Sequence, residues 1–477
     1  MSDSSNESLW PIMQEFLKKE GISNQHINSY NRFIEKGIQE IIRESNTIQI
    51  TTETKKYTIK FGQVSIQNPR IVERDGTVRF LSPAEARLRN ATYSAPIMVQ
   101  VTTILEDNTT RTQQIHIGDI PILVRSKYCM LHNMSQKEII QNKEDPLDLG
   151  GYFIINGSER VVMGYEDISQ NRAMISCDKQ NKQTTYKAAI YSFSAGYRGK
   201  IEITTEKEES AMAIKIPGSP VVIPLIILMK ALGIESDREI IEMISPNSQI
   251  QDQMAPSFDH MEKVPENKES AKKYIGKRIA PGMPSDFQSK RVDAMMDWGV
   301  LPHIGKKPQD RKHKAQVLGD AACRILELKI GYCKPDDRDH YGNKIIRFAG
   351  ELIADVIKTS FRNMIADIQY KLERIDEQNF GQPQNTPYIT SVIRPGIITD
   401  KINNALATGN WGHGRVGISQ TVDRTNYISA LGQLRRILSP LEKSQPNFEA
   451  RDLHGTHWGR ICPAETPEGS NCGLVKN

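Results

Sequence analysis

Residues 450 to 477 read ARDLHGTHWGRICPAETPEGSNCGLVKN, and this run says more about the fold than any other part of the chain. It has no hydrophobic period, and it combines four glycines with Pro463 and Pro467. Glycine permits backbone conformations that a Cβ forbids, and proline rigidifies turns, so the run is typical of structured loops around a site. Little apolar sequence follows to bury such a site, so we expect another polypeptide to continue the structure.

Five shorter motifs precede this run. In order, they are GGYFIINGSERVVMGYE (150–166), LPHIG (301–305), DDRDHYGNK (336–344), ALATGNWG (405–412) and SQTVDRTNYISALGQLRRI (from Ser419). Together with the run at 450–477, they are similar to the second-largest subunit of archaeal and eukaryotic DNA-dependent RNA polymerases. The chain resembles the N-terminal half of that subunit, which some archaea encode separately as a B″ subunit, and the resemblance covers nearly the whole chain.

The resemblance implies a multidomain α+β fold with mostly antiparallel sheets and peripheral helices. It implies four segments: a first protrusion segment at 10–179, a lobe at 180–335, a second protrusion segment at 336–400, and a fork at 401–477 that continues into another chain. The expected function is that of a DNA-directed RNA polymerase subunit, a nucleotidyltransferase of the cytoplasm. The subunit would form one wall of the DNA cleft and carry fork loops that contact the RNA–DNA hybrid and downstream DNA during transcription.

The resemblance also predicts that the isolated chain is inactive and holds no catalytic residue, metal or cofactor of its own. Nucleotidyl transfer needs Mg²⁺ held by clustered carboxylates. Glu465 and Glu468 are separated by Pro467 and make a poor cage, so Mg²⁺ would be bound through another subunit. The expected partners are the other polymerase subunits, especially the C-terminal half of the split subunit and the largest subunit, with the DNA template and the RNA–DNA hybrid, and no membrane.

Composition agrees with this interpretation without deciding it. The chain has 477 residues, of which 38% are hydrophobic and 25% charged, enough for two to four domains that each bury a core. Its net charge of +5 is modest, so any nucleic-acid surface must be local. The first residues have neither the cationic nor the apolar region of a signal peptide, so none is expected. The longest apolar stretch, 221–229, is interrupted by Pro224, so no membrane span is predicted.

Periodicity predicts the main elements. Apolar spacing favours helices at 30–42, around 223–234, at 237–244 with Ser236 or Asp237 as N-cap, and at 351–375, besides a buried helical stripe around 317–326. Alternating runs predict strands before residue 120 and at 185–193, 199–205 and 211–217, and Asn156-Gly157 predicts a tight hairpin turn. The polar, proline-bearing stretch 245–273 is expected to be a surface excursion or a mobile loop.

A basic run precedes the stripe at 317–326. Such a run is usually a solvated face, but in a polymerase it would contact the phosphates of downstream DNA without sequence preference. Both readings stay open. The candidates are Lys306, Lys307, Arg311, Lys312 and Lys314.

The region from 401 onward supplies the other nucleic-acid candidates. The glycine loop around Trp411 and Arg415 is either an ordinary surface loop or, by resemblance, fork loop 1. The polar stretch 439–450 resembles fork loop 2. Gln433 and Thr421 depart from the bacterial segment that binds rifamycins, so weak rifamycin binding is expected. The full set of candidates is Arg415, Gln420, Arg424, Arg435, Arg436, Arg451, His454, His457, Arg460, Glu465 and Glu468.

Two possible metal-binding sites compete with these assignments. His454, His457, Cys462 and Cys472 have zinc-ligand chemistry, but they lack tight CxxC or HxxxH spacing, and packed or backbone-bonded side chains are favoured. The acids of DDRDHYGNK favour an ion-paired connector over a metal site. The six cysteines are expected to stay thiols. The alternative functions are a metal-dependent hydrolase or nuclease using the His pair and Glu465, and a DNA-binding module without an enzyme.

Overall fold

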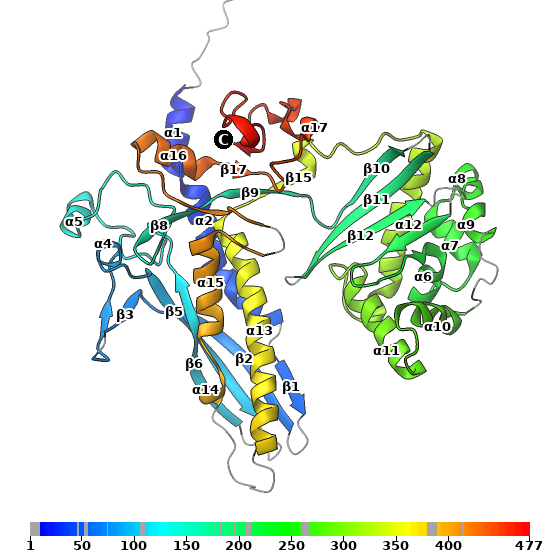
Figure 1. The fold of residues 1–477 in the computed structure, drawn as a ribbon, viewed down its shortest axis with the longest axis horizontal. Coiled ribbons are helices and arrows are strands. Elements are labelled where there is room, and N and C mark those ends of the chain that lie inside the picture. Colours follow the sequence, from blue (N-terminus) through cyan, green and yellow to red (C-terminus); the bar gives the residue numbers. More distant parts are fainter. Residues whose placement is uncertain are drawn as a thin grey trace, which may run out of the picture. The chain divides into compact units, whose positions relative to one another are not determined.

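The computed structural model divides the chain into two compact units, 1–167 with 346–477 and 168–345, which are described separately below (Figure 1). Both units combine helices with mostly antiparallel sheets, so the predicted α+β class is confirmed. The four named domains remain a prediction. The described residues are 10–44, 47–51, 56–73, 75–104, 110–180, 183–194, 197–205, 211–259, 265, 267–378, 389–412 and 415–477.

The first unit is built on an antiparallel sheet in the order β1 (Thr47–Thr51), β2 (Lys56–Ile66), β5 (Ser94–Ile104) and β6 (Thr110–Pro121). Helices α13 (Ala349–Gln378) and α15 (Gly396–Thr408) run along it in Figure 1. Phe61 of β2 meets Phe361 of α13 edge-on, with 5.3 Å between the ring centroids. The helix predicted at 351–375 is therefore confirmed, and its apolar stripe forms part of the core.

The helix predicted at 30–42 is also present, with a local irregularity. It consists of α2 (Asn24–Arg32), a π-helical turn (Phe33–Gly37) and α3 (Ile38–Glu44). Buried residues such as Tyr30, Ile38 and Ile42 face the core. Helix α1 (Trp10–Glu20) precedes them. Apolar periodicity identifies the helix, but it does not reveal the extra residue that a π turn inserts.

The predicted hairpin connects β7 (Phe153–Ile155) and β8 (Ser158–Val162), and it is confirmed. Asn156 and Gly157 have φ values of 49° and 75°, the left-handed conformations that a two-residue hairpin turn requires. Strand β16 (Ser419–Thr421) pairs with β8, so a segment far away in the sequence completes this sheet.

Another small sheet joins the terminal residues to the middle of the chain. Its order is β15 (Lys344–Arg347), β9 (Gly164–Ile168), β17 (Ile437–Leu438) and β18 (Val475–Lys476). β17 pairs with β9 in parallel and with β18 antiparallel. The remaining elements of this unit are β3 (Arg70–Val72), β4 (Val78–Phe80), α4 (Pro83–Leu88), α5 (Gln136–Gln141), α14 (Ile389–Val392), α16 (Tyr427–Arg435) and α17 (Phe448–Arg451).

The second unit packs helices against a five-stranded sheet, and the three predicted strands correspond to β11, β12 and β13. Residues 317–326 lie within α12, whose buried side chains include Leu318 and Ile325. Ser236 is the N-cap residue of α7. The elements are β10 (Ala173–Gln180), β11 (Gln183–Ser194), β12 (Tyr197–Thr205), β13 (Met212–Lys215), β14 (Ile223–Pro224), α6 (Leu225–Leu232), α7 (Asp237–Ile244), α8 (Ser248–Asp252), α9 (Ala255–Asp259), α10 (Lys268–Ile279), α11 (Ser285–Ala294), a π turn (Met295–Gly299) and α12 (Arg311–Ile330).

The expectation for 245–273 needs correction. Its described residues form α8, α9 and the start of α10, and residues 260–264 and 266 lie outside the described part. Ile250 and Met254 are 3% and 1% exposed and pack into the core of this unit. Two buried apolar residues are enough to dock short helices here, although the surrounding composition is polar. Among the described residues, no helix combines the length and the apolar character that crossing a bilayer needs.

Candidate nucleic-acid interface

Arg451 organises the terminal segment 450–477. Its guanidinium donates all five of its N–H groups to backbone carbonyls, which is the full donor capacity of arginine. Nη1 bonds the carbonyls of Ser470 and Cys472 at 2.9 and 2.8 Å. Nε and Nη2 bond the carbonyls of Pro446, Lys443 and Gln445 at 2.8 to 3.1 Å. The side chain predicted to contact nucleic acid therefore holds residues 443–446 against residues 470–472.

The backbone of the same arginine lies close to Gly473. A Cβ on Gly473 would lie 2.4 Å from the Arg451 carbonyl oxygen, and its φ of 72° is left-handed, so this position requires glycine. Thr466 adds further closure, because its hydroxyl donates to Val475 O and accepts from Gly473 N–H, each at 2.9 Å. The segment is thus a loop folded on itself through hydrogen bonds, with few buried apolar side chains.

The two histidines are held by local contacts. His454 accepts from the Thr456 N–H at 3.2 Å and lies 2.7 Å from its hydroxyl through Nδ1, while His457 is buried. Residues 450–477 all lie within the described part. Across that described part, no three His, Cys, Asp or Glu side chains come close enough to hold a metal ion, and all six cysteines are free thiols.

A buried ion pair fastens the end of the segment to β9. Lys476 Nζ lies 3.0 Å from Glu166 Oε2, and the two side chains are 6% and 3% exposed. β18, which carries Lys476, pairs with β17, which in turn pairs with β9. The pair was not predicted, since 310 residues separate its members.

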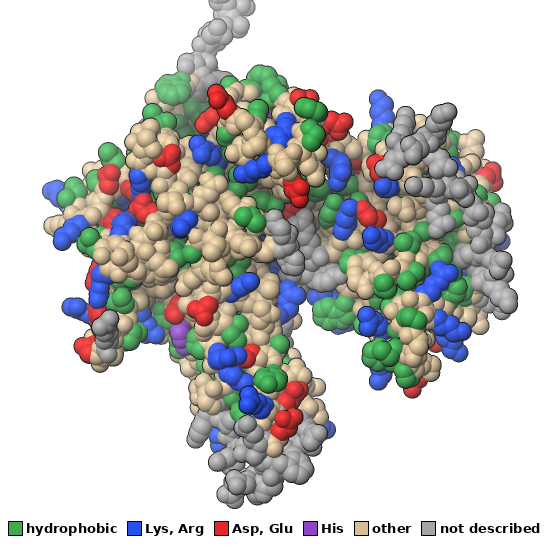
Figure 2. Space-filling view, in the orientation of Figure 1, with side chains coloured by type: hydrophobic (Ala, Val, Ile, Leu, Met, Phe, Trp, Pro, Cys, Tyr) green, Lys and Arg blue, Asp and Glu red, His purple; other side chains and the backbone are tan. Residues whose placement is uncertain are grey.

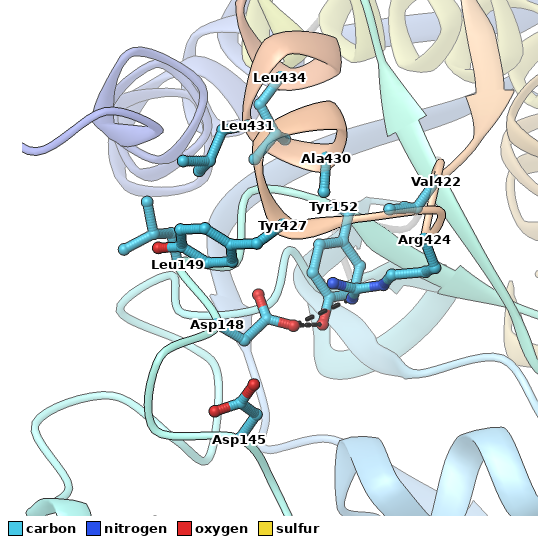
Figure 3. A pocket seen from close by; sticks show the side chains of 10 residues that line it. All are labelled: Asp145, Asp148, Leu149, Tyr152, Val422, Arg424, Tyr427, Ala430, Leu431 and Leu434. Carbon is cyan, nitrogen blue, oxygen red and sulfur yellow. Dashed lines mark hydrogen bonds and ion pairs between the residues drawn. The ribbon is translucent and has the colours of Figure 1, made fainter.

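Arg424, another predicted contact residue, belongs to a closed network of charged and polar side chains, of which Figure 3 shows Arg424, Asp148 and Tyr152. Its Nε lies 2.7 Å from Glu159 and its Nη2 lies 2.9 Å from Asp148. Arg87 bonds the other Glu159 oxygen at 2.7 Å and the Tyr152 hydroxyl at 2.8 Å. That hydroxyl donates to Asp148 at 2.8 Å and closes the ring. The network joins α4, the loop before β7, strand β8 and the segment after β16.

Burial and pairing oppose each other in this network. Burial alone would raise the pKa of Asp148, but hydrogen bonds from the Gly150 N–H and the Tyr152 hydroxyl, and the charge of Arg424, leave that pKa below its ordinary value. Glu144, which pairs with Arg87 at 2.7 Å, has its pKa raised because burial outweighs its partner. The guanidinium of Arg424 thus stabilises a buried carboxylate, and 47% of its side chain remains exposed.

The network borders a shallow pocket that Figure 3 shows from close by. Asp148, Tyr152 and Arg424 line its polar side. The apolar side chains are supplied largely by α16 and the loop before β7, and the full lining is Asp145, Asp148, Leu149, Tyr152, Val422, Arg424, Tyr427, Ala430, Leu431 and Leu434.

Gln433 and Asp423 connect α16 to the segment that precedes it. The buried Gln433 amide donates to Thr421 O at 2.8 Å and accepts from the Asp423 N–H at 2.7 Å. Asp423 accepts hydrogen bonds from the hydroxyls of Ser429 and Thr425 and from the Thr425 N–H, and these lower its pKa to about 2. The Gln433 side chain therefore connects α16 to the end of β16 through hydrogen bonds. The weak rifamycin binding remains a prediction.

The loop around Arg415 is held from inside the unit. Arg415 Nη1 lies 3.3 Å from Asp355, Nη2 lies 3.7 Å from Asp167, and the guanidinium stacks 5.4 Å from the Tyr165 ring centroid. Trp411 donates from Nε1 to Leu352 O at 3.0 Å. Residues 413–414 lie outside the described part. The Arg415 side chain is 15% exposed, so most of it faces protein.

The other candidates near α16 and the terminal segment are exposed or partly exposed. The Arg435 side chain is exposed and makes no hydrogen bond or ion pair with any described residue, and the Arg460 side chain makes one hydrogen bond, to Thr456 O at 3.1 Å. Arg436 has a buried Nε without a hydrogen-bond partner among the described residues. Glu465 and Glu468 are exposed, and a Cβ on residue 432 of α16 would lie 3.8 Å from a Glu465 carboxylate oxygen. Gln420 donates to Gly417 O at 3.2 Å.

The basic run of the second unit separates into two groups. Arg311 is buried between Asp297 at 2.7 Å and Asp293 at 2.9 Å. Lys314 is 0% exposed and donates to the carbonyls of Met296 and Asp297 at 2.8 Å, and burial lowers its pKa to about 8. Both side chains are bonded inside the unit and leave no charged face for a phosphate.

The other three lysines of the run point outward. Lys307 and Lys312 are exposed, and neither they nor Lys306 forms an ion pair with a described residue. Lys306 Nζ lies 4.7 Å from the centroid of the Trp298 ring, which is 56% exposed. Figure 2 shows lysine and arginine side chains over the α10 and α11 end of the same unit.

The acids of DDRDHYGNK act as an ion-paired connector, as predicted. Asp336 pairs with Arg324 at 2.9 Å and accepts from the Ile175 N–H at 2.8 Å, and Asp339 pairs with Lys344 at 3.1 Å.

Residues 21–399 match the family described as RNA polymerase beta subunit, and residues 420–477 match the one described as RNA polymerase Rpb2, domain 3. The chain therefore belongs to the RNA polymerase beta subunit family, which confirms the resemblance.

Two relatives match it over almost their whole length. DNA-directed RNA polymerase subunit Rpo2N of Methanothermobacter thermautotrophicus is 39% identical over 99% of this chain and 94% of its own. Rpo2N of Methanocaldococcus jannaschii is 40% identical over 98% and 93%. Subunit Rpo2 of Saccharolobus solfataricus is 40% identical over 98% of this chain but only 41% of its own length. The chain thus spans about two fifths of the Rpo2 relatives that it matches.

Proposed function

We propose that this chain is one subunit of a DNA-directed RNA polymerase and contributes to template-directed RNA synthesis without being catalytic alone. The observation that carries the proposal is the match over nearly the full length of both this chain and relatives named DNA-directed RNA polymerase subunit Rpo2N. Its partners would be the other polymerase subunits, especially the C-terminal half of the split subunit and the largest subunit, with the DNA template and the RNA–DNA hybrid.

The proposed domain assignment follows the family. The segments 10–179 and 336–400 would form the protrusion, 180–335 the lobe and 401–477 the fork, together making one wall of the DNA cleft. The loop at 409–417 would act as fork loop 1 and the stretch 439–450 as fork loop 2. The Arg451 hydrogen bonds support the second assignment in one respect, because they give that stretch a fixed anchor from which it can meet nucleic acid.

The charged side chains divide by role in this proposal. Arg435, Arg436 and Arg460 are the strongest hybrid-contact candidates, since their guanidinium groups are exposed or have unused donors. Gln420, His454, Glu465 and Glu468 remain candidates near them. Arg415, Arg424, Arg451 and the buried His457 would position these loops, because each is engaged or enclosed within the protein.

Downstream DNA would meet Lys306, Lys307 and Lys312, whereas Arg311 and Lys314 hold the first turn of α12 in place. Neutralising each lysine that contacts a phosphate should lower the slope of log affinity against log salt by about 0.9 on duplex DNA. The K306M/K307M/K312M variant is expected to show this loss in a salt titration of the purified polymerase. K215M, which removes an exposed lysine elsewhere in the same unit, is the matched control.

The Mg²⁺ of nucleotidyl transfer would be bound through another subunit. Glu465 and Glu468 do not fit as its ligands, since no third acidic, histidine or cysteine side chain joins them in the described part of the chain. The ion would stabilise the developing charge of the transferred phosphoryl group. This chain would contribute positively charged walls and loops that hold the nucleic acids in position.

The test is purification of the chain at native level from its own cells, followed by mass spectrometry and a template-dependent RNA synthesis assay. Recovery of a multisubunit assembly that incorporates ribonucleotides is the expected result. Recovery of the chain alone, soluble and monodisperse, would overturn the proposal.

A further inference from the structure

Helix α1 exposes a row of apolar side chains, as far as the described residues show. Ile12, Met13, Phe16 and Leu17 are 68%, 50%, 56% and 37% exposed. With 3.6 residues per turn they occupy one stripe of the helix, and Gln14 lies outside it. We call this stripe, residues 12, 13, 16 and 17, the α1 face. Figure 2 shows apolar side chains at the surface where α1 lies.

A helix of 11 residues is too short to be stable in water by itself and normally depends on packing of its apolar stripe. The connection to the rest of its unit is firm: Ser23 donates to Leu149 O at 3.1 Å, and His26 Nε2 lies 2.8 Å from Leu434 O at the end of α16. The base of α1 is therefore fixed, and its apolar stripe is presented to solvent. Within the same unit, α16 also exposes Ile428, at 79%.

The lengths of the relatives identify an occupant. This chain matches 93% to 94% of Rpo2N relatives but 41% of the Rpo2 relatives, which therefore carry about three fifths of their length beyond the matched part. A second copy of this chain fits poorly, because four side chains of one helix offer much less than the roughly 800 Å² per partner that a stable protein interface buries. A large polypeptide that also contacts other parts of the unit could bury the area that a stable interface needs.

We propose that the α1 face binds the polypeptide equivalent to the unmatched three fifths of the Rpo2 relatives, and that it fixes that polypeptide to this chain. The inference rests on the proposed function. In this complex α1 inserts its apolar side chains into a groove of the partner, and the contact stabilises the helix.

The experiment measures binding between the full chain and the protein of the same organism that matches the unmatched part of the Saccharolobus Rpo2 relatives. The two are expressed separately, and their affinity is measured by biolayer interferometry. The I12D/F16D variant is expected to bind at least 10-fold more weakly than the wild type. Q14D, which places the same charge on the same helix outside the α1 face, is expected to bind within 2-fold of the wild type.

The possible outcomes distinguish a failure of the α1 inference from a failure of the proposed polymerase function. Failure of the wild-type chain to bind the partner would count against both. Wild-type binding that I12D/F16D leaves unchanged would overturn the α1 inference and leave the polymerase proposal standing. Sedimentation of each protein checks the alternative occupant, since a dimer of this chain that I12D/F16D abolishes would assign the face to a second copy. Hydrogen exchange of both variants, unchanged in peptides outside α1, confirms that the substitutions act locally.

Discussion

The hairpin β7–β8 and the terminal segment 450–477 are both short and glycine-bearing, and different forces hold them in place. In the hairpin, Phe153, Ile154 and Val161 are each 0% exposed, so burial of apolar surface fixes it within the main core. In the terminal segment most side chains are exposed, and Arg451 supplies five hydrogen bonds to the backbone around it.

This difference predicts different responses to substitution. Burial is distributed over many contacts and couples a segment to the whole unit, so damage there lowers the stability of the unit. A cluster of hydrogen bonds from one partly exposed side chain acts on the loops that it joins, so damage there should stay local. Loops that meet a substrate benefit from the second arrangement, since they can change conformation without unfolding the core.

The largest effect is expected for the buried ion pair of Lys476 and Glu166, which joins the terminal segment to β9 of the core by a polar contact. K476M should lower the free energy of unfolding of the first unit by about 3–5 kcal/mol, because it leaves a buried carboxylate without its ammonium partner. The measurement is hydrogen exchange of β9 peptides across a urea series. The double variant E166Q/K476M, which buries no charge at this site, should recover most of the loss. Equal urea midpoints for K476M and wild type would show that the terminal segment is independent of the core.

A smaller loss is expected in the hairpin turn. Gly157 has a φ of 75°, and an added Cβ would lie 2.6 Å from Asn90 Oδ1 and 2.8 Å from Asn90 Cα. G157A should therefore cost about 1–2 kcal/mol from the left-handed conformation alone, with a further cost from the contact. Differential scanning calorimetry should show a lower unfolding temperature. G455A in the terminal segment is the control, since a Cβ there meets nothing within 4 Å, and a similar loss from both variants would contradict the comparison.

The sequence predicted the parts of the fold that apolar burial controls. Helix α13, the stripe of α12 and the hairpin were all visible as periodicity or as a turn dipeptide, because regular burial leaves a regular pattern. Helices α8 and α9 were missed, since their composition is polar and two buried residues suffice to dock them. Local patterns cannot report such sparse contacts.

The site was predicted less well, for a related reason. The resemblance gave a list of candidate residues, but it could not separate arginines that face solvent from arginines that hold loops. Arg424 acts on Asp148 and Glu159, which lie 276 and 265 residues away in the chain. Arg87 lies outside every motif in the sequence, and the motifs that contain Tyr152 and Gln433 gave no sign of the hydrogen bonds that these two side chains make. Long-range polar pairing follows from the fold and leaves no period in the sequence.

Local loosening without global unfolding is expected for R451K. A lysine keeps the charge but cannot reproduce five N–H donors in a planar fork, so the contacts to residues 443–446 and 470–472 would be lost in part, at a local cost of about 1–2 kcal/mol. Hydrogen exchange should be about 10-fold faster in peptides covering these residues, with the unfolding temperature unchanged. R460K, at an exposed arginine with one carbonyl bond, should leave exchange unaltered. Faster exchange throughout the first unit would mean that Arg451 supports the core itself.

The smallest effect concerns the loop before α16 and appears only in acid. Hydrogen bonds from the hydroxyls of Ser429 and Thr425 lower the pKa of Asp423 from 3.8 to about 2. A carboxyl with a depressed folded-state pKa contributes stability that is fully present above about pH 4 and is lost as the pH falls through about 2. S429A removes the donor with the largest effect, so the pKa should rise towards its ordinary value and the acid loss of local order should begin at higher pH. NMR titration of the chain labelled with ¹³C at aspartate carboxyls measures this directly, with S439A as the control. A titration of Asp423 near pH 2 in S429A would show that the Ser429 hydroxyl is not needed, and that the Thr425 hydroxyl and N–H hold the carboxylate without it.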